Sequence, residues 1–369
     1  MNYSESMFYI THENINLTGD IGVKKKIYAQ VRVFAKYFPK CLITYYAYGM
    51  AYLMEDGHVI DKEIALSAQE RFRCYSHWMK KYHCRWVYMR CLIPATYNYL
   101  IFLRDMKEMG VRLVLEYPTF PYDGEVKNEE ILREDREYRN QIREYVFQAT
   151  TYAKNKTVYG MHTIELQNGV DLQENPVRTM RKKDNNIGLL AVAGFYFHHG
   201  FERVLESLHK YYQNPGIYDF HLYMVGDGPE RRTYVHLVKE YGLEQYVEFC
   251  GIKTGAALDW YYDNADIGIA PLGVYKADIV SVAPIKTREY CSRGLPFIYG
   301  YEDIGFTGEE PYVRKVENSS APLDMSTVIE LYESTVENKS IIEGMRNYTE
   351  ENFSWDILLE DVVEYMINN

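Results

Sequence analysis

The sequence APIKTREYCSRGLPFIYG, residues 283–300, has the pattern of a helix followed directly by a buried strand. Pro284 suits the first helical position, where the amide proton that proline lacks would have no acceptor. Gly294 is typical of the residue just beyond a helix, and Pro296 precedes the apolar run Phe297–Tyr299. The stretch therefore predicts one helix-to-strand unit of an α/β protein.

The start of this predicted helix has the chemistry of a diphosphate site. The amides of Ile285, Lys286 and Thr287 have no acceptor inside the helix and lie at the positive end of its dipole, where a diphosphate fits. Lys286 adds a positive charge, and Glu289, one turn later on the same face, can accept both hydroxyls of a ribose. An exposed Lys/Glu pair on an ordinary helix would have the same spacing.

Strand-like and amphipathic helical runs alternate along the whole chain, which is typical of a doubly wound α/β architecture. The expected strands lie at residues 7–10, 41–46, 85–89, 111–116, 187–193, 221–225, 247–249, 266–270 and 297–299. The expected helices include residues 64–82, 96–109, 128–147, 201–212, 229–241 and 354–366. A polar, basic stretch at residues 175–186 marks a boundary, and 369 residues suit two domains. We therefore expect two Rossmann-like doubly wound domains facing a cleft, residues 1–180 and 181–352.

The motif P-x-K-x-x-E-Y that begins at Pro284 resembles the donor-binding segment of retaining glycosyltransferases of family 4. This variant is similar to a branch common among bacterial surface and capsular polysaccharide enzymes. In the fuller family pattern two glutamates, separated by seven residues, precede Gly-x-Pro. Glu289 matches the second glutamate, whereas Ser281 stands in place of the first. The resemblance implies the glycosyltransferase-B fold and a nucleotide-diphosphate sugar as donor.

Other short motifs extend the resemblance over most of residues 168–369. N-G-V-D at residues 168–171 and V-G-D-G-P at residues 225–229 are turn signals in themselves, and both recur in the family. F-S-W at residues 353–355 resembles the segment whose helix crosses back to the first domain, so we assign residues 353–369 to that helix. Ile252 follows Cys250-Gly251 and resembles a residue beside the nucleotide base.

A second group of candidate residues follows the predicted strand at residues 187–193. His199-Gly200 leads into a helix carrying Arg203, and such a place aims side chains at the crevice where phosphates bind. H-G-x-[D/E]-R resembles the same polysaccharide branch, although Phe195 stands about where the common pattern has an arginine. We expect His199 and Arg203 to stabilise the departing diphosphate; a core histidine and a surface arginine are the alternative.

In the first half of the chain the candidates are a glycine-rich loop and one carboxylate. T-G-D-I-G-V at residues 18–23 would let the backbone approach a ligand closely, and the family has such a loop near the donor phosphates and the acceptor, so Gly22 is a binding candidate. Glu116 ends a predicted strand and is expected to face the cleft. It could orient the acceptor hydroxyl, or it could cap the following turn.

The composition excludes several classes of function. A formal net charge of -11 disfavours a nucleic-acid partner. The six cysteines show no C-x-x-C and no zinc spacing, so we expect no metal. No signal peptide and no apolar run of about 20 residues is present, which predicts a cytoplasmic protein. Lys24, Lys25 and Lys26 open a predicted helix, where they could contact anionic lipid at the inner face of the membrane or simply be solvated.

We therefore expect an enzyme, a glycosyltransferase of the hexosyltransferase class, acting in surface polysaccharide biosynthesis. The resemblance implies a retaining reaction without a metal or other cofactor, in which a nucleotide-sugar donor reacts with a glycan or lipid-linked acceptor. A nucleotide-sugar epimerase on the same fold and a catalytically silent nucleotide-sugar binding module are the alternatives. The latter is suggested by Ser281 and Phe195, which stand where family members carry charge.

Overall fold

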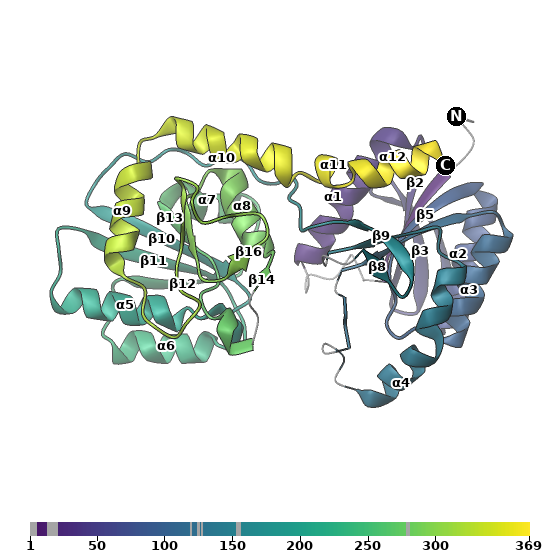
Figure 1. Ribbon diagram of the computed structural model, residues 1–369, viewed down its shortest axis with the longest axis horizontal. Coiled ribbons are helices and arrows are strands. Elements are labelled where there is room, and N and C mark those ends of the chain that lie inside the picture. Colours follow the sequence, from purple (N-terminus) through teal and green to yellow (C-terminus); the bar gives the residue numbers. More distant parts are fainter. Residues whose placement is uncertain are drawn as a thin grey trace. The chain divides into compact units, whose positions relative to one another are not determined.

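The computed structural model describes residues 6–12, 21–118, 120–123, 126, 128–152, 156–277 and 281–369. The chain forms two compact units (Figure 1). Unit 1 consists of Met1–Gln167 and Leu358–Asn369, and unit 2 consists of Asn168–Ile357. Each unit has its own sheet and its own buried apolar residues, so each is described by itself.

Residues 168–180, which the sequence analysis places in the first domain, have their contacts within unit 2. The amide of Val170 donates to the carbonyl of Phe353 at 2.8 Å. Arg178 is buried and donates from Nε to Gly294 O at 2.9 Å and from Nη1 to Ala265 O at 3.0 Å. These bonds tie the polar stretch to the second unit, because a buried guanidinium must find acceptors there.

Unit 1 contains a sheet with strand order β4-β3-β2-β1-β5-β6-β7-β9-β8. β1, β2, β5, β6, β7 and β9 are parallel, β3 and β4 extend the sheet antiparallel to β2, and β8 pairs antiparallel with β9. The strands are β1 Ser6–Ile10, β2 Cys41–Ala47, β3 Met50–Glu55, β4 His58–Ile64, β5 Cys84–Arg90, β6 Arg112–Tyr117, β7 Gln148–Thr151, β8 Thr157–Val158 and β9 Met161–Glu165. The helices are α1 Ile21–Tyr37, α2 Ala68–Lys81, α3 Tyr97–Glu108, α4 Glu129–Tyr138 and α12 Glu360–Asn368, with a 3-10 turn at Arg139–Glu144.

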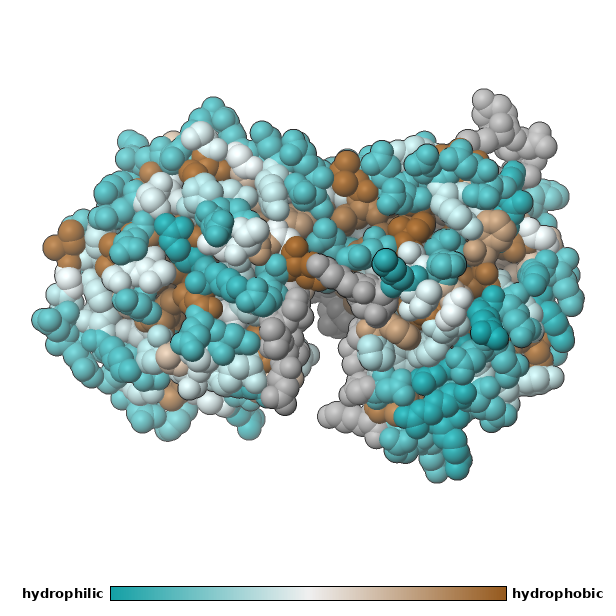
Figure 2. All heavy atoms as spheres, viewed as in Figure 1, coloured by the Kyte–Doolittle hydropathy of each residue, from teal (hydrophilic) through white to brown (hydrophobic). Residues whose placement is uncertain are grey.

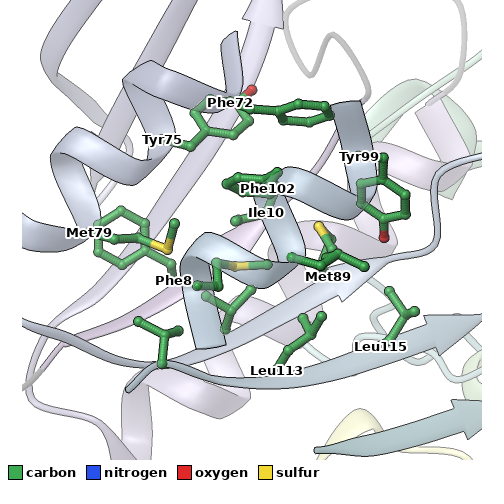
Figure 3. Packing of buried hydrophobic residues seen from close by; sticks show 14 of the residues in the cluster. Phe8, Ile10, Phe72, Tyr75, Met79, Met89, Tyr99, Phe102, Leu113 and Leu115 are labelled. Atoms are coloured by element: carbon green, nitrogen blue, oxygen red, sulfur yellow. The ribbon is translucent and has the colours of Figure 1, made fainter. Parts of the chain in front are cut away.

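Helices cover both faces of the unit 1 sheet. Phe8 and Ile10 of β1 pack with α2 and α3, where Phe72 stacks on Phe102 with ring centroids 4.6 Å apart (Figure 3). Successive strand residues point to opposite faces. Tyr9 therefore points the other way, and its hydroxyl donates to Gln30 of α1 at 2.6 Å. The result is the two-faced burial that defines a doubly wound sheet.

The end of the chain belongs to unit 1. Tyr365 of α12 donates to the carbonyl of Phe147 at 3.3 Å, and the two rings lie 5.7 Å apart. Phe147 in turn contacts Trp86 of β5, with ring centroids 5.5 Å apart. Trp86 points to the face opposite Val87, which packs against α2 and α3. The last helix therefore adds to the face that α1 covers.

Unit 2 contains a parallel sheet with strand order β12-β11-β10-β13-β15-β17, and a short pair of β14 with β16. The strands are β10 Asn186–Ala193, β11 Asp219–Gly226, β12 Val247–Gly251, β13 Ile267–Ile269, β14 Ser281–Val282, β15 Phe297–Tyr299, β16 Glu302–Asp303 and β17 Val313–Lys315. The helices are α5 Glu202–Gln213, α6 Arg231–Glu240, α7 Ala256–Asn264, α8 Ile285–Arg293, α9 Met325–Thr335, α10 Lys339–Asn352 and α11 Trp355–Leu358, with 3-10 turns at Phe197–His199 and Val274–Ala277.

The unit 2 sheet is also covered on both faces. Leu189 and Ala191 of β10 belong to the apolar cluster that α5, α6 and α9 share, whereas Leu190 and Val192 belong to the cluster shared with α7, α8 and α10. A parallel strand that is buried on both sides has a continuous run of apolar residues. This explains why residues 187–193 are apolar without alternation. The expected α/β fold with parallel sheets and two Rossmann-like domains is confirmed.

Two local predictions in unit 1 are wrong. Residues 50–64, left unassigned by the sequence analysis, form the β3–β4 hairpin around Asp56-Gly57, whose φ values are 46° and 79°. Positive φ at both central residues is the Asp-Gly turn that matches strand twist. The helix expected at residues 64–82 therefore begins only at Ala68, after Ser67 caps it. The helix expected at residues 128–147 ends at Tyr138 and continues as a 3-10 turn.

Candidate functional site

The carboxyl edge of the unit 2 sheet is the place where its topology favours a ligand. The chain runs from β10 to β11 and β12 on one side, then returns to β13 on the other side of β10. Ligands bind outside the carboxyl ends of strands at such a reversal. The segment after β10, the turn after β11 and the segment leading into α8 all belong to this unit, and they contain most of the candidate residues.

Glycines bring the loops at this edge into close contact. A Cβ at Gly226 would lie 1.8 Å from Ala193 O, and one at Gly228 would lie 2.1 Å from Gly194 O. Their φ values of 132° and 156° also suit glycine. The V-G-D-G-P turn therefore packs on the end of β10, which explains its glycines without any contact to a nucleotide.

The N-terminus of α8 presents main-chain donors without a side-chain cap. Pro284 is the N-cap residue, with φ -64° and ψ 140°, and it has no side-chain oxygen to accept the first amides. Lys286 Nζ lies 2.5 Å from Glu289 Oε2 on the same face of the helix. Lys286 is partly buried, and Glu289 is buried. The predicted Lys/Glu pair is therefore formed, at the helix end that attracts anions.

Thr287 differs from its neighbours, because its side chain points inward. Its hydroxyl donates to Pro284 O at 3.0 Å and lies 3.0 Å from Asp303 Oδ2. Arg288, the next residue, forms a fully buried ion pair with Asp303 and lies over the ring of Phe353, with Cζ 4.8 Å from the centroid. The Thr287 hydroxyl therefore anchors α8, and only its amide can serve a ligand.

The Arg288–Asp303 pair is a feature that the sequence analysis missed. It joins α8 to β16, and Gly305 N also donates to Asp303 Oδ1 at 2.8 Å. Burial raises the pKa of Asp303, while Arg288 acts against that rise. The sequence shows a basic residue, Arg288, between Lys286 and Glu289. It does not indicate that the partner of Arg288 is Asp303, 15 residues away. The pair fixes the helix whose first turn carries the candidate ligand groups.

His199 is brought near Lys286 by the fold. Tyr196 N donates to His199 Nδ1 at 3.1 Å, which leaves the proton of the neutral ring on Nε2. Burial lowers the pKa of His199 to about 4, with further lowering by His198 and by the positive charge of Lys286. The imidazole is therefore neutral at pH 7, and its Nε2–H is a hydrogen-bond donor close to a lysine from a distant part of the sequence.

Arg203 is 2% exposed, and the acceptors of its described hydrogen bonds are main-chain carbonyls. Nε donates to Ala321 O at 2.5 Å, and Nη1 donates to Leu272 O at 2.5 Å and to Glu317 O at 3.1 Å. Burial lowers its pKa. The bond to Leu272 holds the loop after β13, and the other two bonds hold the segment between β17 and α9. Gly273, the residue after Leu272, packs closely on Gly200. The structure therefore gives Arg203 a positioning role, and its contact with a diphosphate stays a prediction.

The remaining candidates in unit 2 are placed as follows. Ile252 follows β12 at the carboxyl edge and is 66% exposed. Ile285 is half-buried at the start of α8. Ser281 lies in β14 and pairs with Glu302. Phe195 has a fully buried side chain, at 5.9 Å from the ring of Tyr234, so it fills the core where the family pattern has an arginine.

In unit 1, Glu116 lies near the end of β6, and its side chain is 0% exposed. The expectation that it faces the cleft stays a prediction. Glu116 Oε1 lies 2.7 Å from Lys26 Nζ and 3.7 Å from Arg90 Nε, and its Oε2 accepts from Gln30 and from the hydroxyl of Tyr88. Burial would raise the pKa of Glu116, but the charges of Lys26 and Arg90 outweigh burial and lower it. The carboxylate is thus ionised inside the unit, and these donors come from α1 and β5 and not from the following turn.

The glycine-rich loop is described only in part, because Thr18, Gly19 and Asp20 lie outside the described residues. Gly22 is an exposed residue in the first turn of α1. Lys26 points toward Glu116 and Tyr152, with Nζ 4.1 Å from the ring centroid, so it does not share the surface with Lys24 and Lys25. Only two of the three lysines remain for a contact with lipid.

Within the described ranges, every helix is too short or too polar to cross a bilayer. Those ranges also contain no group of three or more His, Cys, Asp or Glu side chains placed to hold a metal ion. On the face seen in Figure 2, hydrophobic residues form small separate patches among hydrophilic ones.

Residues 186–310 match the family described as Glycosyl transferases group 1. The match begins at β10 and ends after β16, so it covers the edge with Lys286, Glu289 and His199. The matched residues all lie within unit 2. No curated protein matches the chain.

Solved structures similar to the chain share its fold over nearly its whole length. Sucrose-phosphate synthase from Thermosynechococcus elongatus gives a TM-score of 0.67 at 13% identity, with 99% of this chain and 98% of that chain covered. A glycosyltransferase from Rickettsia africae gives 0.67 at 13% identity, covering 99% of each chain. Anabaena HepE, solved with UDP, gives 0.65 at 13% identity, covering 99% of this chain and 100% of that chain. The chain therefore has the glycosyltransferase-B fold.

Proposed function

We propose that the protein transfers a sugar from a nucleotide-diphosphate sugar to a glycan or lipid-linked acceptor. The observation that carries this proposal is the convergence of three kinds of anion-binding group in unit 2. They are the uncapped amides of α8, the Lys286 ammonium and the neutral ring of His199, whose pKa Lys286 helps to lower. The family match over residues 186–310 supports the same function.

Each group has a distinct task in the proposed reaction. The amides of Ile285, Lys286 and Thr287, together with the Lys286 charge, neutralise the diphosphate as it leaves. His199 Nε2–H donates a further hydrogen bond. Glu289 accepts the ribose hydroxyls, and Ile252 lies beside the base. Arg203 and Thr287 position other groups with their side chains. Arg203 holds the loop after β13, and the Thr287 hydroxyl holds the first turn of α8.

The chemical step needs no separate cofactor, because the donor is itself a substrate. The bond between the anomeric carbon and the diphosphate oxygen breaks, a bond to the acceptor oxygen forms, and the diphosphate takes the acceptor proton. We propose retention of configuration on the basis of the sequence resemblance. We also propose that no metal takes part, because helix amides and Lys286 supply the positive field that a metal would supply. Direct contact of Glu116 with the acceptor belongs to the same proposal and needs a conformation that exposes its carboxylate.

The finer assignment rests on sequence resemblance. The P-x-K-x-x-E-Y motif supports a hexosyltransferase of surface polysaccharide biosynthesis, acting in the cytoplasm or at the inner face of the membrane. The half-buried Lys24 and Lys25 of α1 are the residues proposed to contact anionic lipid there. Anabaena HepE was solved with UDP, which supports a uridine nucleotide as the first donor to test.

A binding module without turnover is the second candidate, because Phe195 fills the core where the family pattern has a charged residue. One experiment separates the candidates: the protein is incubated with UDP, GDP and ADP sugars, with and without candidate acceptors, and nucleotide diphosphate release is followed. Release that depends on acceptor supports the transferase. Sugar interconversion without release indicates an epimerase, and tight binding with neither indicates a module; both contradict the proposal.

A further inference from the structure

The unit 1 sheet has its own chain reversal, between β1 and β5. β1 lies between β2 and β5, and the chain leaves β1 toward β2 before it returns to β5 on the other side. His12 follows β1, and Arg90 is the last residue of β5. Both residues therefore stand at the carboxyl edge, where a doubly wound sheet favours a ligand. Arg71 of α2 is the third basic residue in this region.

His12 and Arg71 are among the side chains at this edge that have buried polar atoms without a described hydrogen-bond partner. Nδ1 and Nε2 of His12 are both buried and make no hydrogen bond. Nε of Arg71 is likewise buried and makes no hydrogen bond. Among the described residues Arg71 also has no ion pair. Buried polar groups in folded proteins nearly always have partners, so a pair of such groups calls for an explanation. A ligand that accepts hydrogen bonds would satisfy both.

His12 and Arg71 lie against the same ring. The His12 ring lies edge-on to Phe72, with centroids 6.5 Å apart, and the Arg71 guanidinium carbon lies 5.4 Å from the Phe72 centroid. The guanidinium also covers Tyr46, at 5.0 Å. Stacking on aromatic rings holds a guanidinium in place while its edge stays available for a planar acceptor. Its position is therefore fixed before any ligand arrives.

The charges around His12 are positive. After burial, the positive charges of Arg71 and Arg90 are the causes that lower the pKa of His12, to about 3. Lys26 adds a further cation, because it shares Glu116 with Arg90. The set His12, Lys26, Arg71, Arg90 and Glu116, here called the unit 1 basic cluster, has three cations and one carboxylate. It carries a net charge near +2 with a neutral His12, in a chain whose net charge is -11.

We propose that the unit 1 basic cluster binds a phosphate ester, held by Arg71 and His12 in the positive field of Arg90. A phosphate dianion matches the surplus charge of the cluster, and its oxygens accept from a guanidinium edge and from an imidazole N–H. A carboxylate would match only half of that charge. The identification of this group as part of the sugar acceptor rests on the proposed function, whereas the phosphate site itself does not.

The test follows the His12 ring directly. The full chain, labelled with nitrogen-15 in its histidine rings, is titrated with inorganic phosphate at constant ionic strength and pH 7, and H12Q identifies the His12 signals. We expect a saturable shift of the His12 nitrogens, because the ring gains its first partner. Acetate should bind at least about tenfold more weakly, since it brings one charge fewer.

Arg71→Met is the decisive variant, because methionine keeps the apolar stem over Tyr46 and Phe72 and removes the charge. Loss of a charge-assisted pair should weaken phosphate binding by about tenfold or more. Arg73→Met is the matched control, since Arg73 is exposed on the same helix, and it should change affinity by less than about twofold. Lys286→Met should also leave the His12 response unchanged, which separates this site from the proposed donor site of unit 2.

Vesicles containing phosphatidylglycerol form a second arm, which distinguishes a lipid head group from a soluble phosphate. A His12 response to either source supports the site. If His12 responds to neither, or if R71M responds like the wild type, the site is overturned and ordered water is the remaining partner of His12. Failure of sugar transfer, by contrast, would overturn the proposed function and leave the phosphate response intact.

Discussion

The carboxyl edges of the two sheets have the same topology but different charge chemistry. In unit 2, the positive end of α8 is the main feature, its lysine is paired with Glu289, and His199 is neutral. In unit 1, two cations pair with the buried carboxylate of Glu116, namely Lys26 of α1 and Arg90 of β5, and Arg71 is a third cation in the cluster. Main-chain amides suit the diphosphate of the proposed donor, whereas the unit 1 cluster holds a fixed surplus of charge. One fold thus offers two different ways of binding an anion.

Buried charges also differ between the units. Arg288 and Asp303 neutralise each other in unit 2, and Arg203 is satisfied by carbonyls. Glu116 in unit 1 has two cationic partners. A balanced pair contributes chiefly to holding elements together, and an unbalanced cluster leaves charge for a ligand.

The largest expected effect is at the balanced pair. Arg288→Met leaves Asp303 buried without its cation, so the stability of unit 2 should fall by about 3–5 kcal/mol. Hydrogen exchange of the α8 amides, measured by mass spectrometry at increasing denaturant concentration, gives the stability of unit 2 separately from that of unit 1. Arg232→Met is the control, because Arg232 is an exposed arginine of α6. Equal protection of α8 in both variants would show that the pair does not anchor the helix.

Removing the carboxylate from the unbalanced cluster should have a smaller effect. Glu116→Gln keeps the shape but leaves Lys26 and Arg90 facing each other, and unit 1 should lose roughly 2 kcal/mol. Glu108→Gln, at an exposed position of α3, is the matched control and should be nearly neutral. A stability of E116Q equal to that of the control would contradict the account of the cluster.

The same residue predicts a pH dependence. The pKa of Glu116 is lowered from its ordinary value of 4.5, so the unfolded chain takes up a proton at a higher pH than the folded unit. The stabilisation by Glu116 is therefore fully present above about pH 4.5 and is lost as pH falls through the folded pKa. Unfolding followed between pH 3 and pH 6 should show a steeper acid loss in the wild type than in E116Q. Parallel curves would mean that the carboxylate is not ionised in the folded unit.

The smallest effect is expected at His199. Its pKa of about 4 keeps the ring neutral, so turnover should show no titration of this group between pH 5 and pH 7. His199→Gln retains a side-chain N–H donor and should lower kcat/KM by less than about tenfold, whereas His199→Ala should cost about tenfold or more. A rate that follows a group near pH 6.5, and that loses this dependence in H199Q, would show instead that the ring is charged in the donor complex.

The sequence predicts the fold well where the pattern is local. The continuous apolar run at residues 187–193 and the glycine after α8 are each explained by one neighbourhood of the chain, and both predictions are confirmed. The β3–β4 hairpin was missed although Asp56-Gly57 is a strong turn signal, because β4 is mostly exposed and its alternation is polar. Exposed strands have little apolar patterning to detect.

The site was predicted less completely than the fold, because its contacts join distant residues. Lys286 and Glu289 are three residues apart, so their pairing could be anticipated from helical spacing. The partners of Glu116 are 26 to 90 residues away in the chain. The proximity of His199 to Lys286 and the bonds of Arg203 to three carbonyls likewise depend on the tertiary fold. Sequence alone indicated which residue types to examine but not which atoms they meet.

Nucleotide affinity tests whether the first turn of α8 and Lys286 bind two linked phosphates. Calorimetry should compare a nucleoside, its monophosphate and its diphosphate on the wild type, on Lys286→Met and on the control Lys339→Met, whose exposed lysine pairs with Glu343 on α10. We predict that the second phosphate improves affinity by about tenfold or more in the wild type and in K339M, and that most of this gain disappears in K286M. An equal gain in all three proteins would contradict the account.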